Sequence, residues 1–492
     1  MTNTFNQTAD VIVVGGGGSG LAAAVAAAEN GARVILLERR DAIGGTTALS
    51  IGSLTAADTS FQRRRGIRDN ADDLVEDMWK FDSELLTGDA PELRALYARE
   101  SARTLEWLMK HGVAFAGPFP EPPHRVPRMH NVIPSSRSYI ARLSEAATKA
   151  KVTVVTRADV TELLIEDNAV VGVQASVDGR PTAFRAALGV VLASGDFSGS
   201  EELRKKHLSP SAAAAVPVNP DSLGIGHRLA AEAGAELKRM DQLFGPQLRF
   251  PASPKPGLLD RLPTWRWLCR LEALVANNVP PSLLRPVVKS LLVSHMSPTD
   301  TMFRRGAILV DSTGERFGAE TSPAAELAMR PGGRGFLVLD ERIAAEFDVP
   351  PQHVSTAPGI AFAYFKDYRK GRPDLITSAK SPAELARMLG FDRTAIESAI
   401  ASATLSPGYV VLGPVHSMLT VTEGSISVDE RQRVLRSDGS ILVGLFAVGG
   451  VGQGGMMLKG HGHHIGWAMT SGRLVGEFMA QMRLGAKSVN VK

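Results

Sequence analysis

The sequence predicts an α/β protein with two or three domains. A chain of 492 residues is too long for one ordinary hydrophobic core. Near its start, the β-branched run Val11–Val14 leads directly into the glycine-rich turn 15–20, and an alanine-rich stretch follows. A continuous apolar run is typical of a strand that is buried on both faces, and a helix directly after it is typical of a parallel sheet covered by helices.

The turn contains the spacing G-x-G-x-x-G, with glycines at positions 15, 17 and 20. Gly15 permits a tight turn, Gly17 lets the backbone approach a pyrophosphate, and Gly20 lets helix and strand pack closely. The N-terminus of the following helix offers free N–H groups and a partial positive charge to phosphates. These residues predict a dinucleotide-binding site.

The residues after the turn complete this pattern. We expect a helix over Leu21–Asn30, with Gly31 at its C-terminal cap, and a second strand over Val34–Leu37. Glu38 ends that strand at the distance from the glycines where a carboxylate can accept hydrogen bonds from the adenosine ribose. A carboxylate there would repel a 2′-phosphate, so the ribose is expected to be free. The motif by itself does not distinguish NAD from FAD.

Composition excludes several other classes of protein. Apolar residues make up 44% of the chain and charged residues 22%, which is ordinary for a globular protein. The net charge of +4 comes with no long basic run, so nucleic acid is not an expected partner. The single cysteine, Cys269, excludes an intrachain disulfide and a cysteine-rich metal site. No apolar window approaches about 20 residues and no secretion signal is recognised, so we expect a cytoplasmic protein.

The segment after Glu38 favours FAD over NAD. Residues 44–52 read GGTTALSIG, which resembles the FAD-binding subunits that include soluble fumarate reductases, succinate dehydrogenase flavoproteins and 3-ketosteroid dehydrogenases. The resemblance continues at intervals along nearly the whole chain. Its further segments are TRADV at 156–160, ASGDF at 193–197, GAILVDSTGERFGAE at 306–320, GLFAVGG at 444–450 and residues 466–472.

The resemblance implies that the cofactor is FAD and indicates which residues contact it. No histidine lies between Gly45 and Gly52, where some relatives attach the flavin, so we expect non-covalent binding. The implied contacts are Gly15, Gly17, Gly18, Ser19, Gly20, Glu38, Arg39, Gly45, Thr46, Thr47, Gly52, Val160, Ala193, Gly195, Gly450, His464 and Ile465.

The family layout implies a Rossmann-like, doubly wound FAD-binding domain that is interrupted by an α+β substrate-binding cap domain. We expect the FAD-binding domain to comprise residues 1–242 and 419–492, and the cap domain to comprise residues 243–418. Eight prolines lie between Pro251 and Pro298, which agrees with a change of architecture in that region.

The chain lacks residues that bind small dicarboxylates in the fumarate reductases it resembles. Those enzymes use an arginine as general acid, and the matching position here is Pro323 or Ala324. The segments 244–247 and 419–424 stand where they have histidines, and neither segment contains one. Fumarate and succinate are therefore not expected substrates.

The segment 459–464 contains the catalytic candidates. The 3-ketosteroid dehydrogenases polarise a carbonyl with a tyrosine and a backbone N–H, and the matching positions here are Leu458 and Gly462. Lys459 matches the substrate-binding arginine of fumarate reductases, so Lys459 and the Gly462 N–H could together activate a carbonyl. His461 could transfer a proton, because imidazole titrates near working pH. Alternatively, these residues only shape the loop; no metal site is expected.

These observations predict an oxidoreductase that acts on a CH–CH bond beside a carbonyl, in either direction, in a hydrophobic cyclic or steroid-like ketone. Three alternatives stay open: an FAD oxidase or monooxygenase, a fumarate-reductase-like enoate reductase of another unsaturated acid, and a flavoprotein without activity. The electron donor or acceptor is unknown. The apolar stretches Trp265–Val275 and Leu283–Leu292 are interpreted as core, or else as a lid or a surface for peripheral membrane contact.

Overall fold

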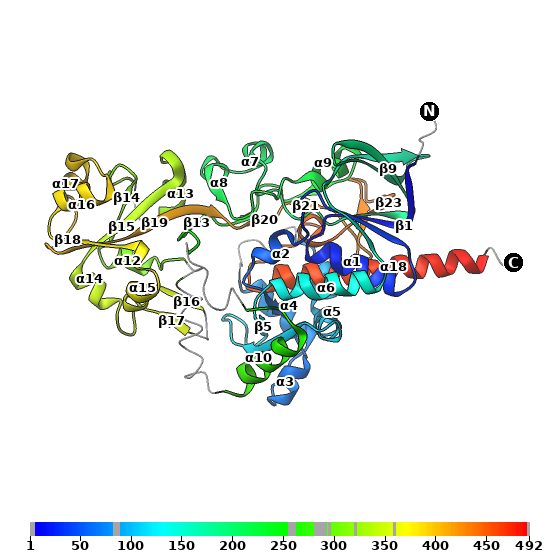
Figure 1. The fold of residues 1–492 in the computed structure, drawn as a ribbon, viewed down its shortest axis with the longest axis horizontal. Coiled ribbons are helices and arrows are strands. Elements are labelled where there is room, and N and C mark those ends of the chain that lie inside the picture. Colours follow the sequence, from blue (N-terminus) through cyan, green and yellow to red (C-terminus); the bar gives the residue numbers. More distant parts are fainter. Residues whose placement is uncertain are drawn as a thin grey trace.

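The structure is a computed structural model that describes residues 5–81, 89–253, 262–279, 293, 297–318, 322–357 and 361–489. It contains two α/β regions that lie side by side along the long axis, with the C-terminal helix α18 (His463–Val489) extending from one end (Figure 1). The first region is built on the sheet that contains β1 (Gln7–Val14), and the second on the sheet that contains β19 (Tyr409–Leu419).

The first sheet has β1 at its centre, between β2 (Val34–Leu37) and β9 (Arg180–Leu192), and it pairs in parallel with both. The sheet joins strands from both ends of the chain, because β23 (Ile441–Ala447) runs parallel to β9 on the other side. The remaining strands are β6 (Thr153–Val155), β7 (Ala158–Glu166), β8 (Ala169–Val177) and β22 (Arg433–Leu435).

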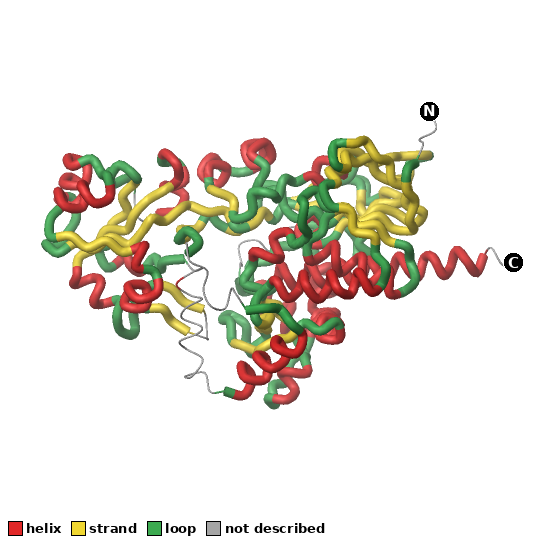
Figure 2. Tube along the Cα trace, viewed as in Figure 1, coloured by secondary structure: helices red, strands yellow, loops and turns green. Residues whose placement is uncertain are grey.

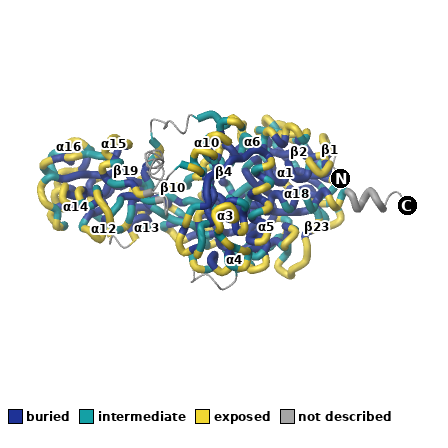
Figure 3. Tube along the Cα trace, turned by 90° about the horizontal axis from the view of Figure 1, so that it is seen from below, coloured by how far each residue is buried: buried dark blue, intermediate teal, exposed yellow. Residues whose placement is uncertain are grey.

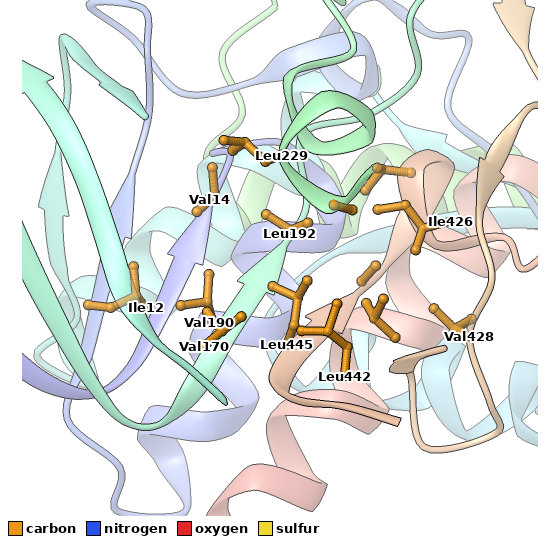
Figure 4. Packing of buried hydrophobic residues seen from close by; sticks show 14 of the residues in the cluster. Ile12, Val14, Val170, Val190, Leu192, Leu229, Ile426, Val428, Leu442 and Leu445 are labelled. Atoms are coloured by element: carbon orange, nitrogen blue, oxygen red, sulfur yellow. The ribbon is translucent and has the colours of Figure 1, made fainter. Parts of the chain in front are cut away.

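Helices and the hydrophobic core cover both faces of this sheet. Ile12 and Val14 pack in one buried cluster and Val11 and Val13 in another, as expected of a strand with no solvent face. Figure 4 shows the first cluster, in which side chains from β1, β8, β9 and β23 meet Leu229. Helices that flank the sheet are α1 (Gly18–Glu29), α5 (Pro91–Lys110), α6 (Arg137–Lys149) and α9 (Ile225–Glu232).

Helix α18 packs on α1 without large side chains between them. A Cβ atom on Gly472 would lie 2.3 Å from the Ser19 carbonyl oxygen, and one on Gly476 would lie 2.5 Å from the Ala23 carbonyl oxygen. The alanine-rich sequence of α1 allows the same close approach from its side. The C-terminal helix is therefore fixed directly against the helix that begins at the glycine-rich turn.

The second sheet is mainly antiparallel and centred on β19. Two short antiparallel pairs connect the regions: β11 (Leu237–Lys238) with β21 (Ser425–Ile426), and β12 (Leu243–Phe244) with β20 (Val421–Thr422). The other strands of the second region are β10 (Val216–Pro217), β13 (Gln247–Arg249), β14 (Ile308–Asp311), β15 (Arg334–Asp340), β16 (Ser355–Ala357), β17 (Ala361–Ala363) and β18 (Ile376–Ala379).

Short helices surround the second sheet (Figure 2). They are α12 (Thr301–Arg304), α13 (Pro323–Ala328), α14 (Glu341–Glu346), α15 (Phe365–Gly371), α16 (Pro382–Leu389) and α17 (Arg393–Ala401). Helices α7 (Glu201–His207) and α8 (Pro210–Ala214) lie between the two regions in the same view.

A small three-stranded sheet forms one side of the first region. It comprises β3 (Ser53–Thr55), β5 (Met129–Ile133) and β4 (Ala114–Phe119), in that order. The helices beside it are α2 (Gly45–Leu49), α3 (Ser60–Arg64), α4 (Ala71–Trp79) and α10 (Arg266–Asn278).

The predicted fold class is confirmed, since a parallel sheet covered by helices is interrupted by a mixed α+β region. The predicted first strand and helix are also found, although the strand begins earlier, at Gln7, and the helix spans Gly18–Glu29. The boundaries after residues 242 and 418 stay predictions. The apolar stretch Trp265–Val275 forms most of α10, whereas Leu283–Leu292 lies outside the described residues.

A buried ion-pair network joins α4 to the small sheet. Arg128 donates two hydrogen bonds to Asp69, of 2.6 and 2.8 Å, and one of 2.5 Å to Asp77, and all three side chains are fully buried. Burial alone would raise the pKa of Asp77, but hydrogen bonds from Arg125, Lys80 and Arg128 outweigh it and hold the pKa below its ordinary value. Arg128 is therefore the cation that the two buried carboxylates share.

Replacing Arg128 with methionine should destabilise the fold by about 3–5 kcal/mol, because it leaves two buried carboxylates without their shared cation. Denaturant unfolding followed by tryptophan fluorescence measures the change. The matched control is Lys205→Met, which breaks an exposed pair with Glu201 and should cost less than about 1 kcal/mol. Equal costs for the two variants would contradict the prediction.

Candidate active site

The glycine-rich turn lies where the carboxyl ends of β1 and β9 meet. The Gly15 N–H donates to the Leu37 carbonyl at 2.8 Å, and the Ala193 N–H donates to the Val14 carbonyl at 2.8 Å. A Cβ on Gly15 would lie 2.5 Å from the Ala193 oxygen, and one on Gly20 would lie 1.9 Å from the Gly15 oxygen. Both positions therefore require glycine, and Gly15 also has a φ of +114°.

In contrast, Gly17 is not crowded. A Cβ on it would make one ordinary contact, 3.9 Å from the Gly45 Cα, whereas a Cβ on Gly45 would lie only 3.2 Å from the Gly17 Cα. Gly17 is also the N-cap of α1, and it has no side chain to cap that end. The Gly18 N–H, the first of the helix, donates to the Thr47 hydroxyl at 3.1 Å. This arrangement places the positively polarised N-terminus of α1 beside Gly45, with no side chain at Gly17 to cover it.

Glu38 is held at the edge of the same turn. One of its carboxylate oxygens accepts from the Gly16 N–H at 2.7 Å and the other from the Arg40 N–H at 2.9 Å. Arg39 forms an ion pair with Asp221 at 3.1 Å. Val160 is buried in β7, close to Glu38 because the Ala158 N–H donates to the Glu38 carbonyl.

A second polar cluster surrounds Thr46. The buried amide of Asn219 donates to the Thr46 hydroxyl at 2.7 Å and to the Ser222 hydroxyl at 3.0 Å. The space beside Gly195 is open, since a Cβ on it would meet only the Ser222 hydroxyl, at 3.9 Å. A Cβ on Gly450 would pack on the backbone of Gly195 and Asp196. The predicted residues Thr46, Gly195 and Gly450 are thus brought near one another.

The segment 44–52 continues toward the small sheet. Gly52 has a φ of +87°, and its carbonyl accepts from the buried Tyr139 hydroxyl at 2.9 Å. Gly462 approaches the following strand so closely that a Cβ on it would lie 2.7 Å from the Thr55 nitrogen. Gly462 is also left-handed, with a φ of +81°. Its position against β3 therefore requires glycine.

Lys459 and His464 meet at a buried carboxylate that the sequence analysis did not single out. His464 Nε2 lies 2.9 Å from Glu423 Oε1, and Gln453 donates to Glu423 Oε2 at 2.7 Å. Lys459 Nζ donates to the Leu243 carbonyl at 3.0 Å, in β12. Burial would raise the pKa of Glu423, but the charge and hydrogen bond of His464, the Gln453 amide and the Lys459 charge outweigh it and lower that pKa.

His461 points to a different partner. Its Nδ1 lies 2.5 Å from Glu121 Oε1, which also accepts from the His461 backbone N–H at 2.7 Å. The histidine side chain is 43% exposed, whereas the glutamate is only 3% exposed. Glu121 therefore fixes the ring through Nδ1 and leaves Nε2 facing outward. Lys459 is thus directed toward β12 and His461 toward the β4–β5 connection.

His463, between these residues, points into the interior. It contacts His124, with the two Nε2 atoms 3.2 Å apart, and both side chains are buried. Burial lowers the pKa of His124 to about 4, and the charge of Arg128 contributes. Burial also lowers the pKa of His463, assisted by His124 and Arg94. Both rings are thus uncharged at neutral pH, so they are packing residues in this network. In the described part of the chain, no group of acidic, histidine or cysteine residues could hold a metal ion.

Sequence reasoning missed Asn219, Asp221, Ser222, Glu121 and Glu423. A signal existed for Glu423, because it lies in the segment 419–424 that was searched for a histidine. Asn219, Asp221 and Ser222 lie in an N-P-D-S sequence, which reads as an ordinary turn. Their partners are more than 170 positions away, so only the fold reveals them.

A helix N-terminus at a glycine-rich turn, an acid at the end of the second strand and a parallel sheet are typical of dinucleotide-binding proteins. Residues 10–264 match the model of the FAD binding domain family, and the chain belongs to that family. The uncrowded backbone at Gly17 and Gly195 fits the FAD expected there: Gly17 and Ser19 would bind its pyrophosphate and Glu38 its ribose. FAD is accordingly the cofactor. The individual contacts stay predictions.

Several characterised proteins resemble the chain. It is 24% identical to NADH:fumarate oxidoreductase of Klebsiella pneumoniae over 90% of this chain and 44% of that protein. It is 33% identical to a urocanate reductase of Eggerthella lenta over 43% of this chain and 36% of that protein. A KsdD-like steroid dehydrogenase of Mycobacterium tuberculosis is 28% identical over 96% of both chains. The chain thus spans less than half the length of the first two relatives.

Solved structures show the same fold. The open conformation of a flavocytochrome c3 fumarate reductase superposes with a TM-score of 0.73 at 21% identity, covering 98% of this chain and 79% of that one. A 3-ketosteroid-Δ4-(5α)-dehydrogenase from Rhodococcus jostii superposes with a TM-score of 0.61 at 22% identity, covering 97% and 98%.

The substitution Gly17→Val should prevent FAD binding while preserving the fold. The φ of −78° at Gly17 suits valine, but the side chain would occupy the gap opposite Gly45. We expect at least about a tenfold loss of FAD affinity, measured by titration of the FAD-free protein. The control is the unfolding midpoint of the FAD-free variant, which should match that of the unaltered FAD-free protein. Normal FAD affinity would exclude this gap as the cofactor site.

The stability of the fold should decrease as the pH falls from about 6.5 toward 4. His124 has a folded pKa of about 4 against 6.5 in the unfolded chain, so the unfolded state takes up its proton first. The stabilisation is complete above pH 6.5 and should fall on the order of 1–2 kcal/mol for this residue by pH 5.

Denaturant unfolding measured at about pH 7.5, 6 and 5 tests that expectation. His124→Gln should make the decline shallower, whereas His353→Gln, a half-buried histidine of the second region, should leave it unchanged. An identical pH profile for His124→Gln would contradict the assignment.

Proposed function

We propose that the chain is an FAD-dependent oxidoreductase that acts on a carbon–carbon bond next to a carbonyl group, and that its substrate is a neutral, hydrophobic cyclic or steroid-like ketone. The observation that carries this proposal is the cluster of Lys459, His464 and buried Glu423 beside the predicted flavin contacts Gly450 and Ile465. Bound FAD supplies the hydride acceptor or donor.

Lys459 and the Gly462 N–H are the proposed donors to the carbonyl oxygen. Charge develops on that oxygen as the α-carbon gains or loses its proton, and fixed donors stabilise such charge in a site with little water. In the described chain, the Gly462 N–H donates to no acceptor, so it is available for this role. Glu423 holds the lysine and His464 in one network and acts as a positioning residue.

His461 is the proposed proton-transfer group. Because its Nδ1 is held by Glu121, the imidazole presents Nε2, which can accept or return the α-proton. Glu121 is a positioning residue in this proposal, since its carboxylate is buried and, among the described residues, forms hydrogen bonds only with His461.

Charge at the site favours a neutral substrate over a dicarboxylate. Glu423 is fully buried and stays ionised, so its charge offsets that of Lys459, which would otherwise attract a substrate carboxylate. Pro323 and Ala324, buried at the start of α13, match the position where fumarate reductases have an arginine as general acid. Neither side chain can donate a proton. The full-length similarity to the KsdD-like steroid dehydrogenase supports the same substrate class.

Reduction of another unsaturated acid is a second candidate, supported by the 33% identity to the urocanate reductase. The two candidates differ in an anaerobic experiment with the purified flavoprotein. Bleaching of the flavin by a saturated cyclic ketone or 3-ketosteroid supports the first. Reoxidation of the dithionite-reduced protein by urocanate or another enoate, with no response to any ketone, supports the second.

Lys459→Met should slow flavin reduction by the ketone on the order of 10²–10³-fold without loss of FAD, because it removes one donor to the developing oxyanion. Stopped-flow absorbance of the flavin measures the rate, and Lys459→Arg should recover part of it. The matched control is Lys238→Met in β11, which breaks a partly exposed ion pair with Glu236. An unchanged rate in Lys459→Met would exclude the lysine from the reaction.

A further inference from the structure

Helix α10 carries its large apolar side chains on the outside. Trp267 is 63% exposed and Leu274 61%, and Leu271 and Val275 are also exposed. Positions 267, 271 and 274 recur at helical spacing and therefore form one stripe. An exposed stripe of this size is unusual for a helix that has a neighbour to pack against.

The opposite face of α10 carries small side chains and is already packed and hydrogen-bonded to the small sheet. Cys269 and Ala273 are buried toward β4. Asn277 donates to the Phe115 carbonyl and accepts from the Gly117 N–H, both at 3.0 Å. The helix is thus attached to the small sheet through its narrow face, and attachment to the fold does not require the tryptophan and leucine stripe.

The stripe continues toward the predicted cofactor site. Trp265 stacks on Trp267 with ring centroids 6.0 Å apart. Trp265 also lines a cavity of about 650 Å³, whose other walls include Ile43 and Ala48 of the segment that resembles an FAD contact. Leu49, next to Ala48, is 55% exposed. An apolar surface therefore extends from α10 to the segment beside Gly45.

Positive charge accompanies this surface. Among its described residues, this region carries Arg266 and Arg270 against a single acid, Glu272. In α10, Arg270 is exposed, whereas burial raises the pKa of Glu272. Figures 1 and 3 show α3 on the same side of the molecule, and its exposed Arg64 adds to the charge.

We propose that the stripe on α10 docks on the surface of an anionic lipid bilayer. Exposed tryptophans beside aliphatic residues lie at the boundary between head groups and acyl chains, and nearby arginines are attracted to anionic lipids. None of the described helices could span a membrane, so the contact is peripheral. The docking also provides a substrate route, which rests on the proposed function. A hydrophobic ketone passes from the bilayer along the cavity at Trp265 toward the flavin site.

Co-sedimentation of the FAD-containing protein with vesicles tests the docking. We expect binding to vesicles that contain phosphatidylglycerol, at least about tenfold tighter than to phosphatidylcholine alone, and weaker at high salt. Trp267→Ser combined with Leu274→Ser should reduce that affinity at least about tenfold, and Arg270→Glu should reduce it only for the anionic vesicles. The altered side chains are exposed, so FAD content and the unfolding midpoint serve as controls for folding.

The matched control is Val349→Ser combined with Met388→Ser, which removes two exposed apolar side chains from the second region and should leave binding unchanged. Equal vesicle binding by the α10 variant and the unaltered protein would overturn the docking, as would no binding to anionic vesicles. A dimer in light scattering that the α10 variant abolishes would also overturn it, because a second copy would then cover the stripe.

Flavin bleaching by a dissolved ketone separates this inference from the proposed function. If the flavin is bleached by a ketone but the protein does not bind vesicles, the proposed reaction is supported and the membrane docking is excluded. If the protein binds vesicles but no ketone bleaches the flavin, the docking is supported. The ketone reaction and the substrate route along the cavity are then both excluded.

Discussion

Direct contact between backbones at the carboxyl edge of the first sheet is the constraint on which the rest of the structure depends. Gly15 packs on the Ala193 carbonyl and Gly20 on the Gly15 carbonyl, at distances that exclude a side chain. These contacts set the start of α1, and α1 in turn positions α18 through Gly472 and Gly476. The cofactor site and the segment with the catalytic candidates are thus fixed to one another through glycine contacts.

The sequence predicted the parts of the molecule that depend on local spacing. The strand 11–14, the glycine turn and Glu38 follow one another in the chain, and each has a short-range physical reason. The FAD assignment and the fold class followed from the same segments and from a resemblance spread over the chain. The structure explains why residue 462 is glycine, through its φ and its contact with Thr55, whereas the catalytic role of its N–H stays a prediction.

Contacts between distant segments could not be predicted in this way. Glu423 meets His464 and Glu121 meets His461, but neither carboxylate belongs to a motif. In the sequence, three histidines within 461–464 look equivalent. In the fold, they contact three different groups, because each successive side chain leaves the backbone in a different direction. These groups are the buried Glu121, the buried His124 and Glu423 near the junction of the two regions.

The sheet of the first region has a consequence for synthesis of the protein. Strand β23 pairs with β9 although about half of the chain separates them, and Gly450, His464 and Ile465 follow β23. β23 and the start of α18 must therefore be synthesised before the predicted cofactor site can be completed. Until then, β9 presents an unpaired edge and α1 lacks its partner helix, so the nascent chain depends on transient protection of that edge.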